Sequence, residues 1–118
     1  MDHIILKGKG ELQNIAELIM SKRNDFTNGS LKIHRKTGAG EFILLIFEKY
    51  YLRNKSRSTL TVTLHQDGSD VVVDTVGSGG ASGMFLNISL GANYEFVMSI
   101  ADILKPVGFV IEEEEEDQ

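Results

Sequence analysis

The sequence contains no cysteine and only one proline among its 118 residues. Without cysteine, the chain can form no disulfide framework, thiolate nucleophile, zinc knuckle or iron–sulfur cluster. Its three histidines, His3, His34 and His65, lie about thirty residues apart, so they do not form the close pair that a helix-borne metal site uses. We therefore expect neither a metal ion nor another cofactor.

Long apolar runs are absent as well. No run approaches the roughly 18–20 residues that a membrane-spanning helix requires. Near the start, the apolar run Ile4–Leu6 is shorter than the roughly 7–15 residues of a secretory signal, and Asp2 and His3 precede it in place of positive charge. We expect a cytoplasmic protein without a membrane span.

Positive charge is scarce in the second half of the chain. Residues 61–118 contain one cation and eleven acids, whereas residues 1–60 contain eleven of the twelve Lys and Arg residues. Six of the acids form the run from Glu112 to Asp117, and a like-charged block at a chain end usually stays solvated and disordered. We predict a single domain over residues 1–111 and an acidic disordered tail over residues 112–118.

The spacing of apolar residues predicts two helices and a series of strands. Near the start, apolar residues recur at the helical interval of three and four positions, and from Ser30 onward apolar and polar residues alternate as in strands. The dipeptide Asp67-Gly68 favours a tight hairpin turn. The predicted elements are strands over residues 3–7, 30–34, 41–52, 59–66, 70–76 and 84–90, helices over residues 11–23 and 93–104, and either a short strand or an irregular end over residues 107–111.

This order of elements (β-α-β-β-β-β-β-α) predicts an α+β domain of two layers. We expect an antiparallel sheet of about five to six strands, with one helix from the N-terminal half and one C-terminal helix on the same face. The element order is similar to helix-on-sheet families such as the TATA-binding-protein-like and helix-grip folds. The strand around Phe42–Phe47 is apolar on both faces, so its second face requires cover from a helix, a loop or another subunit.

A glycine-rich segment over residues 77–83 is the most conspicuous motif. A phosphate cradle usually leads into a helix, whereas the alternation after this segment predicts a strand. A flexible connection or a β-bulge is therefore the favoured interpretation, and contact with a ligand or partner is the alternative. The residues assigned to such contact are Gly77, Ser78, Gly79, Gly80, Ser82 and Gly83.

The stretch from Gly77 to Ala92, followed by an amphipathic helix, resembles small bacterial domain families of unknown function. The resemblance extends over most of the chain in element order and over specific residues only around positions 77–92. It implies no activity, because such families have no established catalytic residues. We therefore expect an uncharacterised protein.

A basic segment with two tyrosines follows the most apolar strand. Interleaved basic and aromatic side chains can hold single-stranded nucleic acid. The acidic pI of about 5.1 and the lack of a known nucleic-acid motif instead favour a solvated hairpin tip, balanced by Glu48 or by the acidic tail. Nucleic acid is not an expected partner. The residues assigned to contact in this segment are Tyr50, Tyr51 and Arg53, which lie among Lys49, Lys55 and Arg57.

We consider three functions. The first is a non-catalytic binding or interaction module, a homodimer that covers the apolar second face of the sheet. The second is a carrier of a small apolar ligand, with a groove between the C-terminal helix and the sheet. The third is an enzyme that uses His65, Asp67 or the glycine-rich segment, since a histidine beside a carboxylate can act as a general base. No nucleophile accompanies that pair, so we expect no catalysis and favour the first function.

Overall fold

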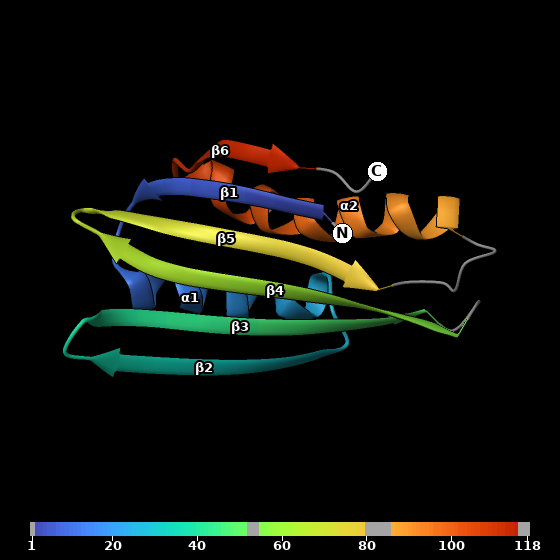
Figure 1. Cartoon of the computed structure of the whole chain (residues 1–118), viewed down its shortest axis with the longest axis horizontal. Coiled ribbons are helices and arrows are strands. Elements are labelled where there is room, and N and C mark those ends of the chain that lie inside the picture. The colour runs from blue at the N-terminus through green and yellow to red at the C-terminus, as the bar shows by residue number, and fades with distance from the viewer. Residues whose placement is uncertain (1, 52–54, 80–85, 116–118) are drawn as a thin grey trace.

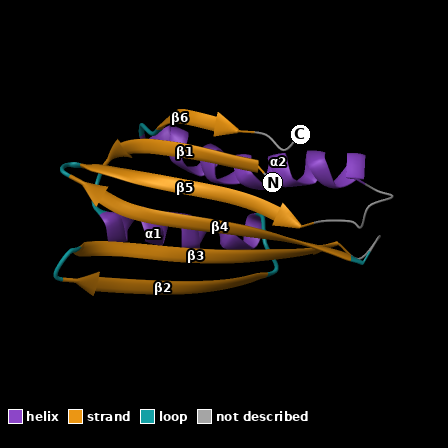
Figure 2. Cartoon of the chain, in the orientation of Figure 1, coloured by secondary structure: helices purple, strands orange, loops and turns teal. Residues whose placement is uncertain are grey.

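The structure is a computed structural model and describes residues 2–51, 55–79 and 86–115. Six strands form one antiparallel sheet in the order β2-β3-β4-β5-β1-β6, and two α-helices lie on one side of it (Figures 1 and 2). The α+β class, the antiparallel sheet and the two predicted helices are confirmed. The strands are β1 (Asp2–Lys9), β2 (Gly29–Thr37), β3 (Gly40–Tyr51), β4 (Ser56–Asp67), β5 (Asp70–Gly79) and β6 (Val110–Glu115), and the helices are α1 (Leu12–Ser21), α2 (Leu86–Leu104) and the short 3-10 helices η1 (Arg23–Asp25) and η3 (Lys105–Val107).

The strands from β2 to β5 follow one another as hairpins. Asp67 pairs with Asp70, so Gly68 and Ser69 form a two-residue loop between β4 and β5. Gly68 adopts a φ of 64°, a value that glycine reaches without steric cost, as the predicted hairpin requires. β1 then pairs with β5 and inserts between β5 and β6.

The core lies between the helices and the inner face of the sheet, which is the face toward the helices. α1 packs on β3 and β4, and α2 packs mainly on β5 and β1. The predicted apolar stripe of α1 is buried. On the inner face, alternate residues of β3 and β4 are fully buried, because side chains along a strand point to opposite faces. These residues are Ile43, Leu45, Phe47, Leu60, Val62 and Leu64.

The predicted strand over residues 84–90 is wrong from Leu86 onward, because α2 begins there and continues without a break to Leu104. The apolar residues of this run fit the two-residue period of a strand and also the 3.6-residue period of a helix. Leu86 and Leu90 are four residues apart, and both share a helical face with Val97. Gly91 suggested a break, but one glycine inside a helix costs only about 1 kcal/mol. The glycine-rich segment therefore precedes a helix, while residues 80–85 lie outside the described part of the chain.

The sequence predicted a disordered tail from residue 112 onward. The structure instead places the first part of the acidic run in strand β6. β6 extends to Glu115 and pairs with β1, with Glu113 opposite Ile5 and Ile111 opposite Leu6. The register shifts between these pairs, so Glu112 occupies a β-bulge. Backbone pairing along β1 accommodates this acidic segment at the sheet edge, where its side chains reach solvent. Residues 116–118 lie outside the described part.

The start of α1 is capped by a residue from another element. Glu11 precedes α1 but makes no side-chain capping hydrogen bond. Instead, Gln66 of β4 accepts a hydrogen bond from the backbone N–H of Leu12 at 3.1 Å. The same amide donates to the carbonyl oxygens of Gly10 and Asp70, both at 3.0 Å. One side chain therefore joins α1, the end of β1 and the β4–β5 hairpin.

Candidate functional site

The open face of the sheet, which points away from the helices, has an apolar half. Five aliphatic and aromatic residues of β2 and β3 gather there through the strand register, which sets Leu31 opposite Ile46 and Ile33 opposite Leu44. Leu31 is 53% exposed and Phe42 is 38% exposed. No element within the described residues lies over this face (Figure 2). We call these residues the open-face cluster: Leu31, Ile33, Phe42, Leu44 and Ile46.

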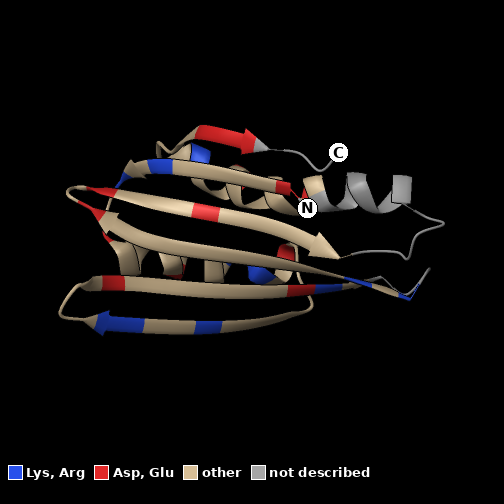
Figure 3. Ribbon diagram, in the orientation of Figure 1, with Lys and Arg blue, Asp and Glu red and all other residues tan. Residues whose placement is uncertain are grey.

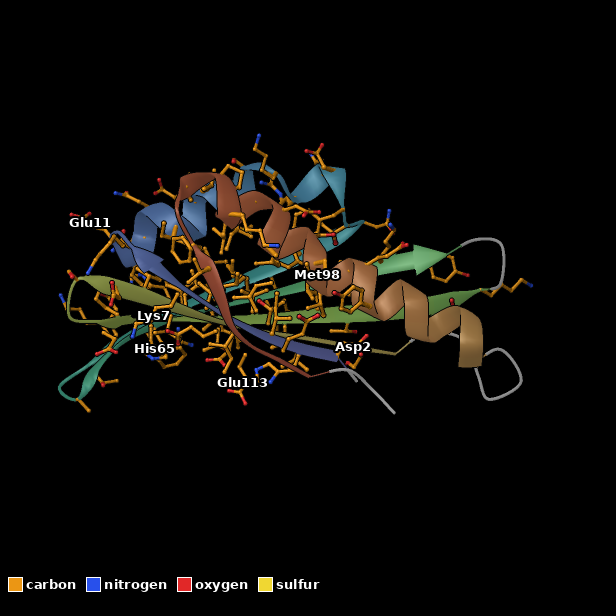
Figure 4. All side chains as sticks on the ribbon, turned by 90° about the horizontal axis from the view of Figure 1, so that it is seen from above. Asp2, Lys7, Glu11, His65, Met98 and Glu113 are labelled. Atoms are coloured by element: carbon orange, nitrogen blue, oxygen red, sulfur yellow. The ribbon has the colours of Figure 1, made fainter. Side chains whose placement is uncertain are left out.

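The other half of the open face carries charged side chains among the half-buried Ile5, Val72 and Val76. His3 Nε2 lies 3.3 Å from Asp74 Oδ1, and Asp70 contacts Lys9 at 3.0 Å and Lys7 at 3.9 Å. Seen from above, Lys7 and Glu113 lie on the side of the sheet away from α2 (Figure 4). Such partly exposed ion pairs add little stability. Alternating threonines of β4 separate this half from the apolar half.

The sheet brings two of the predicted contact segments together. Gly79 pairs with Ser58, which in turn pairs with Lys49, so the end of β5 and the tyrosines of β3 lie at the same end of the sheet. Tyr50 is 41% exposed on the open face. Gly79 packs so closely that a β-carbon there would lie 2.6 Å from the carbonyl oxygen of Arg57. The glycine at this position is thus required by local packing.

The structure describes some of the other residues predicted for contact in these two segments, and the rest lie outside its described part. Gly77 is buried on the inner face, and Ser78 lies on the open face. The Arg57 guanidinium lies 3.6 Å from Glu48, so the expected charge balance by Glu48 is present. The remaining predicted residues, Gly80, Ser82, Gly83 and Arg53, lie outside the described part of the chain.

The inner face becomes polar next to these glycines. Asp2 lies opposite Gly77, Ser58 opposite Gly79, and Thr75 opposite Ile4, and all three polar residues are buried. The hydroxyl oxygen of Thr75 has no hydrogen-bond partner among the described residues. An unsatisfied buried hydroxyl costs roughly 1–3 kcal/mol. This buried polar patch was not foreseen, because Asp2 and Thr75 are far apart in the sequence.

The histidine and aspartate proposed for catalysis lie far from the described end of the glycine-rich segment. His65 and Asp67 lie at the end of β4, and His65 pairs with Val72. Gly79 is seven residues farther along β5, which corresponds to about 24 Å at the rise of a strand. His65 and Gly79 therefore cannot contact one small substrate. Among the described residues, no group of His, Asp or Glu side chains could hold a metal ion.

Comparison with protein families gives a match for this chain. The model of a family of unknown function matches residues 1–108 of the 118-residue chain. The chain belongs to the family DUF6054. The expected membership of a family of unknown function is thereby confirmed, while the matched residues end before β6. No curated protein matches this DUF6054 chain. No helix within the described residues is long and apolar enough to span a membrane.

The helix side of this DUF6054 domain contains a groove of about 490 Å³ between α1 and α2. Its apolar lining includes Phe26, which is buried, and Val107, which is 50% exposed. The predicted groove was between the C-terminal helix and the sheet, but Val97, Ile100 and Leu104 fill that interface with fully buried side chains. The apolar lining residues are Leu18, Phe26, Ile103, Pro106 and Val107, and the charged ones are Lys22, Asp25 and Asp102.

Proposed function

We propose that this chain is a non-catalytic interaction module that forms a homodimer by packing its open face on the open face of a second copy. The open-face cluster carries this proposal, because it exposes apolar side chains on a face that no described element covers. Contiguous apolar patches with a polar rim are typical of interaction sites. A cytoplasmic location is part of the same proposal.

A second copy is the partner that fits the layout of the cluster. An apolar patch is complementary to itself, and a two-fold dimer uses the same patch on both subunits. Arg35 lies at one end of the cluster, opposite Phe42, and Glu48 follows at the other end. If the two-fold axis lies between the two open faces and perpendicular to the strands, the strands of the second copy run in the opposite direction. Arg35 of each copy then lies near Glu48 of the other. These opposite charges favour a two-fold dimer.

A lysine in the centre of the cluster is expected to abolish the dimer. Leu44 lies between Ile33 and Thr63 on the open face, so Leu44→Lys places a charge where the second sheet would exclude water. Native mass spectrometry and sedimentation velocity are expected to show a dimer for the wild type and a monomer for the variant. Val107→Lys is the matched control, because it adds the same charge to an exposed apolar residue on the helix side. A wild type that is strictly monomeric at micromolar concentration contradicts the proposal.

The second candidate function is transport or storage of a small apolar ligand. The groove between α1 and α2 favours it, because its volume and apolar lining suit an acyl chain or a similar molecule. Lys22 in the lining offers a positive charge for an acidic head group, although Asp25 and Asp102 also line the groove. In this case native mass spectrometry of gently purified protein is expected to show a monomer with additional mass.

Ligand binding in the groove is expected to raise the thermal stability of the protein. A ligand at about 100 times its Kd adds about 2.7 kcal/mol to the free energy of unfolding. A thermal-shift panel of fatty acids and related apolar molecules provides the measurement. Val107→Lys is expected to abolish the shift, whereas Leu44→Lys on the opposite face is expected to retain it. The absence of a shift across the whole panel excludes this function.

A further inference from the structure

The two edges of the sheet carry opposite charge. β2 forms one edge and β6 forms the other. β2 contains three basic residues and no acidic one, whereas four of the six residues of β6 are glutamates (Figure 3). The basic residues are Lys32, Arg35 and Lys36, and all three are exposed, as are Glu112, Glu113 and Glu114.

Several of these edge charges have no ion-pair partner among the described residues, although Glu41 of β3 lies opposite Lys36 and contacts His34. Within the part of the chain that the structure describes, Lys32, Lys36, Glu112 and Glu113 form no ion pair, whereas Asp70 and Asp74 in the middle of the sheet do. The two edges are separated by four strands, a distance of about 24 Å at the usual strand spacing. The acidic edge therefore cannot reach the basic edge of its own chain.

The topology allows the two edges to pair between copies. All neighbouring strands in the six-stranded sheet are antiparallel, so β2 and β6 run in opposite directions. A second copy shifted in the plane of the sheet thus presents β6 antiparallel to β2, with its helices on the same side. Pairing of two β2 edges sets cations opposite cations, and pairing of two β6 edges sets glutamates opposite glutamates, which is unfavourable.

We propose that the basic edge β2 binds the acidic edge β6 of a second copy by strand addition. One register that keeps the faces aligned places Arg35 opposite Glu113. The next pair in this register is His34 and Glu114, whose side chains contact Glu41 and Tyr94 of their own chain. This contact goes beyond the open-face dimer, because it uses the strand edges and leaves the open-face cluster free. It is a heterologous contact, so at protein concentrations above those at which the open-face dimer forms it adds further copies or closes into a ring.

Charge reversal at each edge tests this contact. Arg35→Glu with Lys36→Glu sets glutamates opposite Glu112 and Glu113, and Glu112→Lys with Glu113→Lys sets lysines opposite Arg35 and Lys36. Each double variant alone is expected to lose edge association, with an association constant at least about ten-fold lower than that of the wild type. An equimolar mixture of the two variants is expected to associate again, and so is a chain that carries all four substitutions. Sedimentation velocity over a concentration series provides the measurement.

A matched control separates edge pairing from a general effect of net charge. Glu17→Lys with Glu95→Lys changes the net charge as much as the β6 variant does, but at exposed positions of α1 and α2. We expect it to associate like the wild type. The edge contact is also expected to weaken in about 1 M salt, where the Debye length falls to about 3 Å, whereas the apolar open-face dimer persists.

Different outcomes contradict the open-face dimer and the edge contact. If Leu44→Lys abolishes the dimer and neither double charge variant differs from the wild type, the edge charges do not hold copies together and the edge proposal is overturned. If Leu44→Lys has no effect while the charge swap restores the association lost in each double variant, the edge contact stands and the open-face dimer is rejected. Circular dichroism of each variant verifies that the fold is retained.

Discussion

Replacing Phe47 by alanine is expected to lower the free energy of unfolding by about 3–5 kcal/mol. Phe47 is fully buried on the inner face of β3, and its ring meets that of Phe26 edge-on at a centroid distance of 5.1 Å. Phe26 in turn contacts Phe96 of α2. Truncation of Phe47 leaves a cavity beneath both helices, because the surrounding sheet cannot collapse to fill it. Urea denaturation followed by circular dichroism measures the loss.

Phe42→Ala is the matched control on the same strand. Phe42 is 38% exposed on the open face, so its loss is expected to cost about 1 kcal/mol or less in the monomer. Association stabilises the folded state, so both variants are compared at several protein concentrations. Phe42→Ala is expected to remove part of the concentration dependence, and Phe47→Ala is expected to leave that dependence in place. Equal losses in the monomer would mean that the open face is covered within one chain.

Gly8→Ala is expected to lower the free energy of unfolding by about 1–3 kcal/mol, although alanine normally stabilises a strand relative to glycine. Gly8 is buried in β1, and a β-carbon there would lie 2.5 Å from Cδ1 of Phe109 and 2.6 Å from Cγ. Phe109 is itself only 2% exposed, so the ring has little space to move. The extra methyl group therefore overpacks the core.

Removal of the ring is expected to rescue this variant in part. In a double-mutant cycle, Gly8→Ala is expected to cost less in the presence of Phe109→Leu than in the wild type, because the clash is absent. Gly38→Ala provides the control, since a β-carbon at this turn position meets no atom within 4 Å. Its effect on thermal and chemical unfolding is expected to stay within about 0.5 kcal/mol. Independent costs of the two core substitutions would contradict the packing explanation.

The sequence predicted best those elements in which the spacing of apolar residues fits either a helix or a strand, but not both. The stripe of α1 and the alternation along β4 each fit a single geometry, so both appear in the structure. Residues 86–90 fit two geometries, and their continuation into α2 selected the helix. The acidic run was assigned to a tail because its charges repel one another, but pairing with β1 holds it as an edge strand up to Glu115.

The candidate surface was only partly predictable. Alternation in β3 indicated that both faces of this strand are apolar, but it could not show which face the helices cover. The glycines were similarly ambiguous. The predicted first strand ended at residue 7, yet Gly8 lies within β1 and makes room for Phe109, which follows about a hundred residues later. The groove between α1 and α2 also depends on how the two helices pack side by side.

The sequence by itself determined the absence of cysteine chemistry, because this is a matter of composition. It also determined that two helices and the hairpins from β2 to β5 are present, because these elements depend on side chains within a few positions of one another. Only the tertiary structure decided the strand order, in which β1 inserts between β5 and β6. That order brings His3 to Asp74 across 71 residues, sets Gln66 at the start of α1, and leaves a basic and an acidic strand at opposite edges. Contacts between distant segments arise from packing of the whole sheet, which no local period specifies.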